Sequence, residues 1–170
     1  RNVASPSCLF EAALGRWCCQ DVLTFYPRIP EISTFCPKRF AVQEKKLWKS
    51  YLSSFLWGWA AKLILSWLFA KQWEETCQVI NLSSVLIGFR EVALLKIDAE
   101  KAEEDVLDGI FDDDWLKIKQ LAVECHCGEA QVDRLKNLLC LKGYEVERLD
   151  STVFPQLDNP LLKCRRKRED

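Results

Sequence analysis

The sequence contains no methionine, a single histidine and few glycines. The six glycines are far apart, at Gly15, Gly58, Gly88, Gly109, Gly128 and Gly143. They form no glycine-rich turn of the kind that lets a backbone approach a nucleotide, and no phosphate-binding loop is present. The G-x-S-x-G pattern of many serine hydrolases is also missing. Without these motifs, the sequence does not indicate a serine hydrolase of this kind or a nucleotide hydrolase. Because the chain starts at Arg1 without any Met, we expect that natural sequence precedes it.

Neither sign of charge dominates, since 24 Lys and Arg face 25 Asp and Glu, for a net charge of -1. A balanced total gives no reason to expect a nucleic-acid partner or an anionic membrane. Nine cysteines are scattered through the chain, mostly inside apolar runs and without a secretory leader. We therefore expect reduced thiols and a cytoplasmic protein. A length of 170 residues suits one domain, residues 1–170, with a real core.

The clearest pattern lies between Val92 and Cys127. A short apolar run, 92–97, ends abruptly in acidic residues, which is typical of a buried parallel strand. Apolar residues then recur at helical spacing over 102–110, which predicts an amphipathic helix whose acids, Glu103 among them, face solvent. A second apolar run, 121–125, stops at His126. The segment therefore predicts a β-α-β unit with a right-handed crossover.

Ligands of such units bind at the carboxyl ends of the strands, where we expect Asp98, Glu100 and His126 to meet. His126 is the only imidazole and the best candidate for a general base. The two carboxylates could orient a substrate hydroxyl, a cofactor amine or a metal ion. The alternative is structural: acids at the start of a helix complement its dipole, and a lone histidine is often simply packed.

Two further features of this segment concern charge and metal binding. Lys96 lies inside the apolar run, so we expect its ammonium to pair with Glu100 or Glu124. Cys125 and Cys127 flank His126, but neighbouring residues of a strand point to opposite faces. A zinc site is therefore not expected there, and we assign no metal ligand.

The rest of the chain predicts one unusual segment and several ordinary ones. Five tryptophans crowd residues 42–73, which we expect to form a helical insertion or lid. A membrane span over 51–69 is disfavoured because Lys62 at its centre costs about 2.5 to 3.5 kcal/mol, although an interfacial helix stays open. We expect strands at 21–26, 144–149 and 161–165, and a helix through Val132 and Leu139 that ends before Gly143.

Three segments resemble the FkbM-type family of S-adenosylmethionine-dependent methyltransferases. They are LLKIDAEKAEEDVL (94–107), DWLKIKQLAVECH (114–126) and LTFYPRIPEISTF (23–35). The resemblance implies an α/β fold with part of a Rossmann-like class I methyltransferase sheet, mostly parallel with an antiparallel last strand. It also implies S-adenosylmethionine (SAM) as cofactor, with His126 and Asp98 catalytic. Positions that would bind cofactor or position substrate are Glu100, Lys96, Glu124 and Ser33. The chain departs from the family pattern at Cys125 and Cys127.

Two functions compete. The first is methyl transfer, most simply to an oxygen of a small-molecule or carrier-bound substrate, in a domain of which this chain is the C-terminal half. The substrate oxygen would attack the methyl sulfonium, and His126 or Asp98 would receive the proton. The second is a catalytically silent, methyltransferase-like remnant that serves as an interaction module. A membrane-associated protein that uses the tryptophan-rich segment is a third alternative.

The missing glycine-rich turn has two consequences for the isolated chain. We expect it to bind SAM weakly, because only one wall of the cofactor site is represented. We also expect the strand at 92–97 to have an uncovered edge where the cofactor-binding strands of the N-terminal half would pair. The chain would then form homo-oligomers, or cover that edge with residues 21–26 or with the tryptophan-rich helix.

Overall fold

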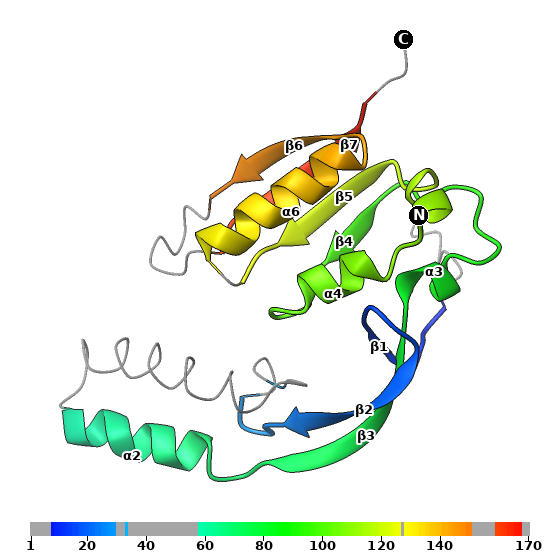
Figure 1. Cartoon of the computed structure of the whole chain (residues 1–170). Helices are drawn as coiled ribbons and strands as arrows, with labels where there is room; N and C mark the ends of the chain where they lie inside the picture. The colour runs from blue at the N-terminus through cyan, green and yellow to red at the C-terminus, as the bar shows by residue number, and fades with distance from the viewer. Residues whose placement is uncertain (1–7, 30–32, 34–57, 127, 151–158, 168–170) are drawn as a thin grey trace, which may run out of the picture. The chain divides into compact units, whose positions relative to one another are not determined.

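A computed structural model of the chain describes residues 8–29, 33, 58–126, 128–150 and 159–167. Within them the fold is mixed α/β with two sheets, one of three strands and one of four (Figure 1). The chain divides into two compact units, Arg1–Cys19 with Gln78–Asp170, and Gln20–Cys77. The elements follow in the order β1 (Ala13–Leu14), β2 (Cys19–Phe25), α2 (Gly58–Leu68), β3 (Trp73–Ile80), α3 (Leu82–Val85), β4 (Leu95–Ile97), α4 (Glu103–Asp108), α5 (Asp112–Trp115), β5 (Gln120–Glu124), α6 (Glu129–Leu141), β6 (Tyr144–Leu149) and β7 (Leu161–Arg166).

The four-stranded sheet of the larger unit has the order β4-β5-β7-β6. Strands β4 and β5 are parallel, with Leu95 opposite Leu121 and Ile97 opposite Val123. Helix α4 lies between them in the chain, so the predicted β-α-β unit is confirmed. Strand β7 runs antiparallel to both β5 and β6, which confirms the antiparallel last strand. The first strand is shorter than expected, because Val92 makes only an isolated parallel bridge to Ile118.

One hydrophobic core holds this unit together. Helix α6 lies across a face of the sheet (Figure 1), and its Leu135 and Leu139 are fully buried. They belong to one cluster with apolar side chains of α4, β5 and β7. Tyr144 is also fully buried, and its hydroxyl donates to the carbonyl oxygens of Trp115 and Ile118 at 3.1 and 2.9 Å. Buried apolar side chains contribute about 1.5 to 3 kcal/mol each, so this cluster fixes the sheet that carries the strand ends.

Two glycines are required by the backbone. Gly143 has φ 86°, a left-handed conformation, and follows helix α6 as the sequence predicts. Gly109 follows helix α4, where a Cβ atom would stand 2.4 Å from the carbonyl oxygen of Gly15. Such an approach is too close for any side chain, so the segment before β2 packs directly on the end of α4. The acidic residues 112–114 form the first turn of α5.

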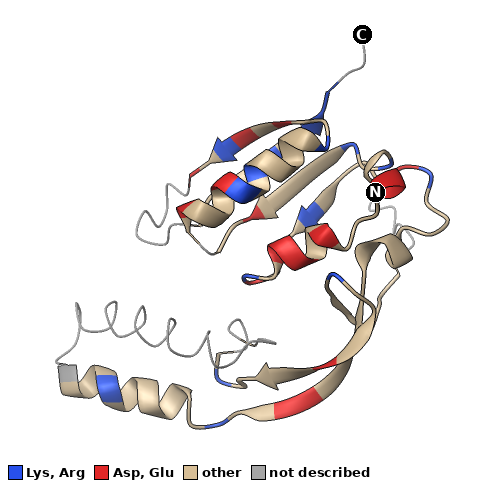
Figure 2. Ribbon diagram, in the orientation of Figure 1, with Lys and Arg blue, Asp and Glu red and all other residues tan. Residues whose placement is uncertain are grey.

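The smaller unit contains β2, α2 and most of β3. Strands β2 and β3 are neighbours in the three-stranded sheet, so residues 21–26 pair with β3 and not with β4. Tyr26, Ile29, Leu65 and Phe69 form the small core of this unit. Helix α2 carries one charged residue, Lys62 (Figure 2), and no helix of the described residues is long and apolar enough to cross a membrane. Residues 42–57 of the expected insertion lie outside the described residues.

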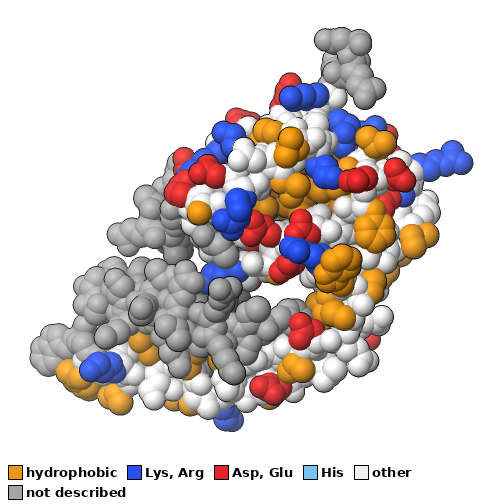
Figure 3. Space-filling view, in the orientation of Figure 1, with side chains coloured by type: hydrophobic (Ala, Val, Ile, Leu, Met, Phe, Trp, Pro, Cys, Tyr) orange, Lys and Arg blue, Asp and Glu red, His pale blue; other side chains and the backbone are white. Residues whose placement is uncertain are grey.

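The surface and the thiols agree with the composition. Acidic and basic side chains lie interspersed on the face of the molecule shown in Figure 3. Among the described residues these cysteines are not joined in disulfides: Cys8, Cys18, Cys19, Cys77, Cys125, Cys140 and Cys164. Two of them, Cys125 and Cys164, are buried in the core, and burial raises the pKa of the Cys164 thiol to about 12. A thiol with so high a pKa stays protonated near neutral pH, so Cys164 contributes to core packing and is not a nucleophile.

Candidate functional site

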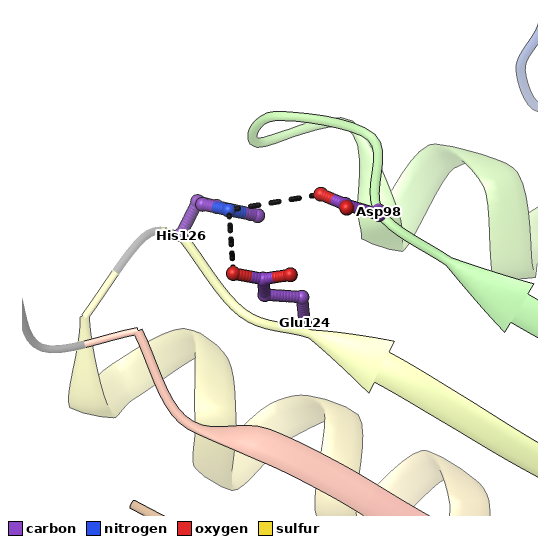
Figure 4. Close-up of side chains that lie close together, drawn as sticks. All are labelled: Asp98, Glu124 and His126. Carbon is purple, nitrogen blue, oxygen red and sulfur yellow. Dashed lines mark ion pairs between the residues drawn. The ribbon is translucent and has the colours of Figure 1, made fainter. Parts of the chain in front are cut away.

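The parallel pair brings three predicted site residues together. Asp98 follows β4 directly, Glu124 is the last residue of β5, and His126 lies two residues further on (Figure 4). His126 Nε2 lies 4.0 Å from Asp98 Oδ1 and 3.7 Å from Glu124 Oε1. Glu100 Oε2 lies 3.8 Å from the same nitrogen. The carboxyl ends of the two strands therefore form an acidic cluster around one imidazole, which we call the His126 site.

Glu103 is the residue of this site that the sequence interpretation missed. We expected it on the solvent face of its helix, but the structure places it fully buried. Its Oε1 lies 2.7 Å from His126 Nδ1 and accepts from the backbone N–H of Lys101 at 2.9 Å. Its Oε2 accepts from Gln131 Nε2 at 3.2 Å. A buried carboxylate is stable only with such partners, so the contacts explain its position.

Helical spacing held a signal for this burial. Glu103 precedes the buried Val106, Leu107 and Ile110 by three, four and seven positions. Those are the positions of a single helix face, so Glu103 lies on the apolar stripe and not opposite it. This position of Glu103 is overlooked if every charged residue is assumed to face solvent. An acid on the apolar face of a helix predicts a buried polar partner, here His126.

The mutual influence of these groups is visible in their pKa values. Burial alone would lower the pKa of His126, but its hydrogen bond to Glu103 and the charges of Glu100, Glu103 and Glu124 outweigh it, so the pKa is raised. Burial raises the pKa of Glu100, with the other carboxylates acting in the same direction and His126 opposing them. Burial also acts to raise the pKa of Glu103, yet hydrogen bonds from His126 and Lys101 bring it below its usual value. The site thus favours a cation at its centre.

The turn between β4 and α4 has an unusual backbone. Glu100 has φ 43° and Lys101 has φ 81°, both in the left-handed region that L-residues rarely occupy. Each such residue costs roughly 1 to 2 kcal/mol. The hydrogen bond from the Lys101 N–H to Glu103 helps to hold the turn. Residues that deviate in this way gather at functional sites, and this turn carries the carboxylate of Glu100 toward His126.

We expect Lys101→Gly to stabilise the chain by about 1 kcal/mol, because glycine adopts this φ without steric cost and keeps the N–H that Glu103 accepts. Lys101→Ala is the matched control, since it removes the side chain but keeps the strain. Urea unfolding of both variants gives the comparison. A glycine variant no more stable than the alanine variant would mean that the turn is not strained.

The structure also places the remaining predicted residues. Lys96 pairs with Asp98 Oδ2 at 2.8 Å, not with Glu100 or Glu124, and its side chain is 60% exposed rather than buried. The prediction failed because alternate residues of a strand face opposite sides, so an edge strand exposes one of them. Ser33 belongs to the smaller unit, where its Oγ accepts from the Tyr26 N–H at 3.2 Å. Cys125 is fully buried and does not belong to the cluster of possible metal ligands.

The site offers carboxylate oxygens and one imidazole, which can bind a hydroxyl, an amine or a metal ion. The described residues do not fit SAM by themselves. Gly109 packs against the backbone of Gly15 and Gly143 follows the end of α6, so neither glycine is free to approach a nucleotide. Gly88 and Gly128 open onto free space, but each stands alone in the sequence. Among the residues that the structure describes, we therefore find no glycine-lined turn that admits a nucleotide.

Comparison with known proteins finds sequence similarity to methyltransferases. It is 30% identical over 149 residues to the 31-O-demethyl-FK506 methyltransferase FkbM of Streptomyces tacrolimicus, which covers 85% of this chain and 56% of that protein. It is also 30% identical over 143 residues to Methyltransferase 1 of Beauveria bassiana, which covers 80% of this chain and 51% of that protein. The AMB antimetabolite synthetase AmbE of Pseudomonas aeruginosa is 28% identical over 140 residues, only 7% of its length.

No family model and no solved structure matches the chain. The chain spans about half the length of the two curated methyltransferases. The match with FkbM agrees with the motifs that the sequence shows at both strand ends, LLKID and VECH. We conclude that this chain is related by descent to the FkbM-type methyltransferases.

Proposed function

We propose that this chain is the acceptor-side half of a SAM-dependent methyltransferase that transfers a methyl group to an oxygen. The observation that carries the proposal is the His126 site: it lies at the carboxyl ends of a parallel strand pair, where open α/β sheets bind their ligands. The similarity to two curated methyltransferases supports the reaction class. The name of the FkbM relative specifies a 31-O-demethyl substrate, which supports oxygen as the acceptor.

The proposal includes a finer description of the fold. The four-stranded sheet, with its parallel pair β4-β5 and antiparallel β7, corresponds to the second half of a Rossmann-like class I sheet. Both compact units are parts of one domain, residues 1–170, in which residues 42–73 form the insertion or lid. In such a sheet β4 pairs with a cofactor-binding strand. SAM would be held chiefly by residues on that side and would supply the methyl group.

The residues of this chain bind and orient the acceptor. Oxygens of Asp98, Glu100 and Glu124 surround the position that a substrate hydroxyl would occupy, and His126 Nε2 faces the same position. The hydroxyl donates its hydrogen bond to this cluster, and its proton passes to Asp98 or His126. Orientation of the attacking oxygen and removal of its proton are the two contributions that such a site makes to methyl transfer. The substrate is a hydroxylated small molecule, free or carrier-bound.

The test is a methyl-transfer assay with the protein purified at its natural length. The protein is incubated with SAM that carries a radioactive methyl group and with a panel of hydroxylated macrolides and carrier-bound hydroxy acids. We expect label in an ether product of at least one acceptor. Binding of SAM without labelled product from any acceptor, including water-soluble extracts of the source cells, would favour the silent interaction module.

A further inference from the structure

Three side chains that commonly bind metal ions converge where β4 and β5 end. One ligand atom each of Asp98, Glu124 and His126 lies within 4.8 Å of the other two (Figure 4). The distances from His126 Nε2 to the two carboxylates, 4.0 and 3.7 Å, exceed hydrogen-bond length. Two metal bonds of about 2.0 to 2.4 Å each span such separations. The gap is too wide for direct hydrogen bonds and wide enough for an ion.

The imidazole is already oriented for this role. The His126 side chain is 6% exposed, and its Nδ1 is engaged by Glu103 at 2.7 Å. Glu103 is itself fixed by Lys101 and Gln131. A carboxylate on one ring nitrogen is the usual support of a histidine that binds metal through the other. This contact turns Nε2, the nitrogen that remains, toward Asp98 and Glu124.

The two carboxylate oxygens of Asp98 have different neighbours, which leaves one of them for a metal ion. Oδ2 accepts from Lys96 Nζ at 2.8 Å, while Oδ1 is the oxygen that faces His126 Nε2. The ammonium therefore fixes the carboxylate without occupying the oxygen that points into the cluster. Glu124 is 35% exposed and Asp98 is 37% exposed, so an ion can enter from solvent.

Charge gives the third argument. Four carboxylates, those of Asp98, Glu100, Glu103 and Glu124, surround the imidazole. Lys96 pairs with Asp98, and His126 is a second cationic partner when it is protonated. The four carboxylates outnumber these two groups. Clustered anions of this kind repel one another, and a divalent cation compensates them.

We propose that the chain binds one divalent cation of the Mg²⁺ and Mn²⁺ class through Asp98 Oδ1, Glu124 Oε1 and His126 Nε2. Carboxylates with one imidazole suit these ions, and among the residues that the structure describes the cluster includes no thiolate. Three protein ligands leave the remaining octahedral positions to water or substrate. If the proposed methyl transfer is correct, one of these positions would hold the acceptor hydroxyl, and the ion would lower the pKa of that hydroxyl. His126 would then act as a metal ligand and not as the base, because Glu103 already occupies its Nδ1.

The experiment titrates the chain with Mn²⁺, in the absence of SAM and of any acceptor. Electron paramagnetic resonance counts the free ion, and we expect one saturable site. Amide signals at residues 97–100 and 124–126 should broaden first in the nuclear magnetic resonance spectrum, because the paramagnetic ion relaxes nearby nuclei. This localisation needs no variant, so it stands even if a variant fails to fold.

Variants then test the three ligands. We expect Glu124→Gln, Asp98→Asn and His126→Gln each to weaken Mn²⁺ binding at least about tenfold. The matched control is Glu145→Gln, which removes one carboxylate from β6 at the other edge of the sheet and should leave the affinity unchanged. Circular dichroism verifies that each variant is folded.

The proposal is overturned if the chain shows no saturable Mn²⁺ site, if broadening begins elsewhere, or if folded Glu124→Gln binds as tightly as the parent. Because the titration uses neither SAM nor an acceptor, its outcome is separate from that of the methyl-transfer assay. A chain that binds Mn²⁺ without transferring methyl groups would keep the cation site and lose the proposed enzyme function. A chain that transfers methyl groups without binding Mn²⁺ would keep the proposed enzyme function and lose the cation site.

Discussion

We expect Asp98→Asn and His126→Gln each to lower turnover in the methyl-transfer assay by about 10² to 10⁴, the usual range for losing acid–base assistance. Asparagine keeps the shape of Asp98 and removes its charge, and glutamine keeps a hydrogen-bonding group in place of the imidazole. Both residues lie at the strand ends, with His126 Nε2 4.0 Å from Asp98 Oδ1. Little stability should be lost with Asp98→Asn, because its ion pair with the 60% exposed Lys96 is screened by solvent.

Asp133→Asn serves as the control for this prediction. It is the same substitution on the exposed face of α6, and it should leave turnover unchanged. Rates are compared at saturating acceptor, and melting temperatures are recorded beside them. Normal turnover with a clearly lower melting temperature would show that Asp98 is a helix-start acid and His126 a packed histidine. The catalytic assignment would then be withdrawn.

The second large effect concerns stability. Glu103→Ala should lower the free energy of unfolding by about 3 to 5 kcal/mol, because it leaves the buried partners of Glu103 without their acceptor. These partners are His126 Nδ1, the Lys101 N–H and Gln131 Nε2, and Gln131 is itself 2% exposed. Denaturation by urea, followed by circular dichroism, measures the loss.

Glu104→Ala is the matched control on the same helix. Glu104 pairs with Arg134 at 2.7 Å, but the side chains are 36% and 59% exposed, so this ion pair is worth less than about 1 kcal/mol. If the two alanine variants lose equal stability, Glu103 does not support the imidazole in solution. The spatial argument for an oriented His126 would then fail as well.

The sequence alone determined the local order of elements in the larger unit. Hydrophobic runs and helical spacing predicted α4 between the parallel β4 and β5, and α6 with its end at Gly143. They also predicted the strands β6 and β7, whereas the antiparallel direction of β7 was implied by the family resemblance. These features are encoded in neighbouring residues, because periodicity and turn chemistry act over a few positions. The same patterns placed Asp98, Glu100 and His126 at the carboxyl ends of the two parallel strands.

Only the tertiary structure decided which groups touch. Glu103 is buried because His126, Lys101 and Gln131 satisfy its oxygens, and these partners come from another strand end, a turn and another helix. Lys96 pairs with Asp98 because β4 exposes that side of the strand at the edge of the sheet. Glu124 joins Asp98 and His126 through the register of β4 against β5. Side-chain partners depend on the register and packing of distant segments, which no local pattern specifies, so the composition of the site follows from the fold.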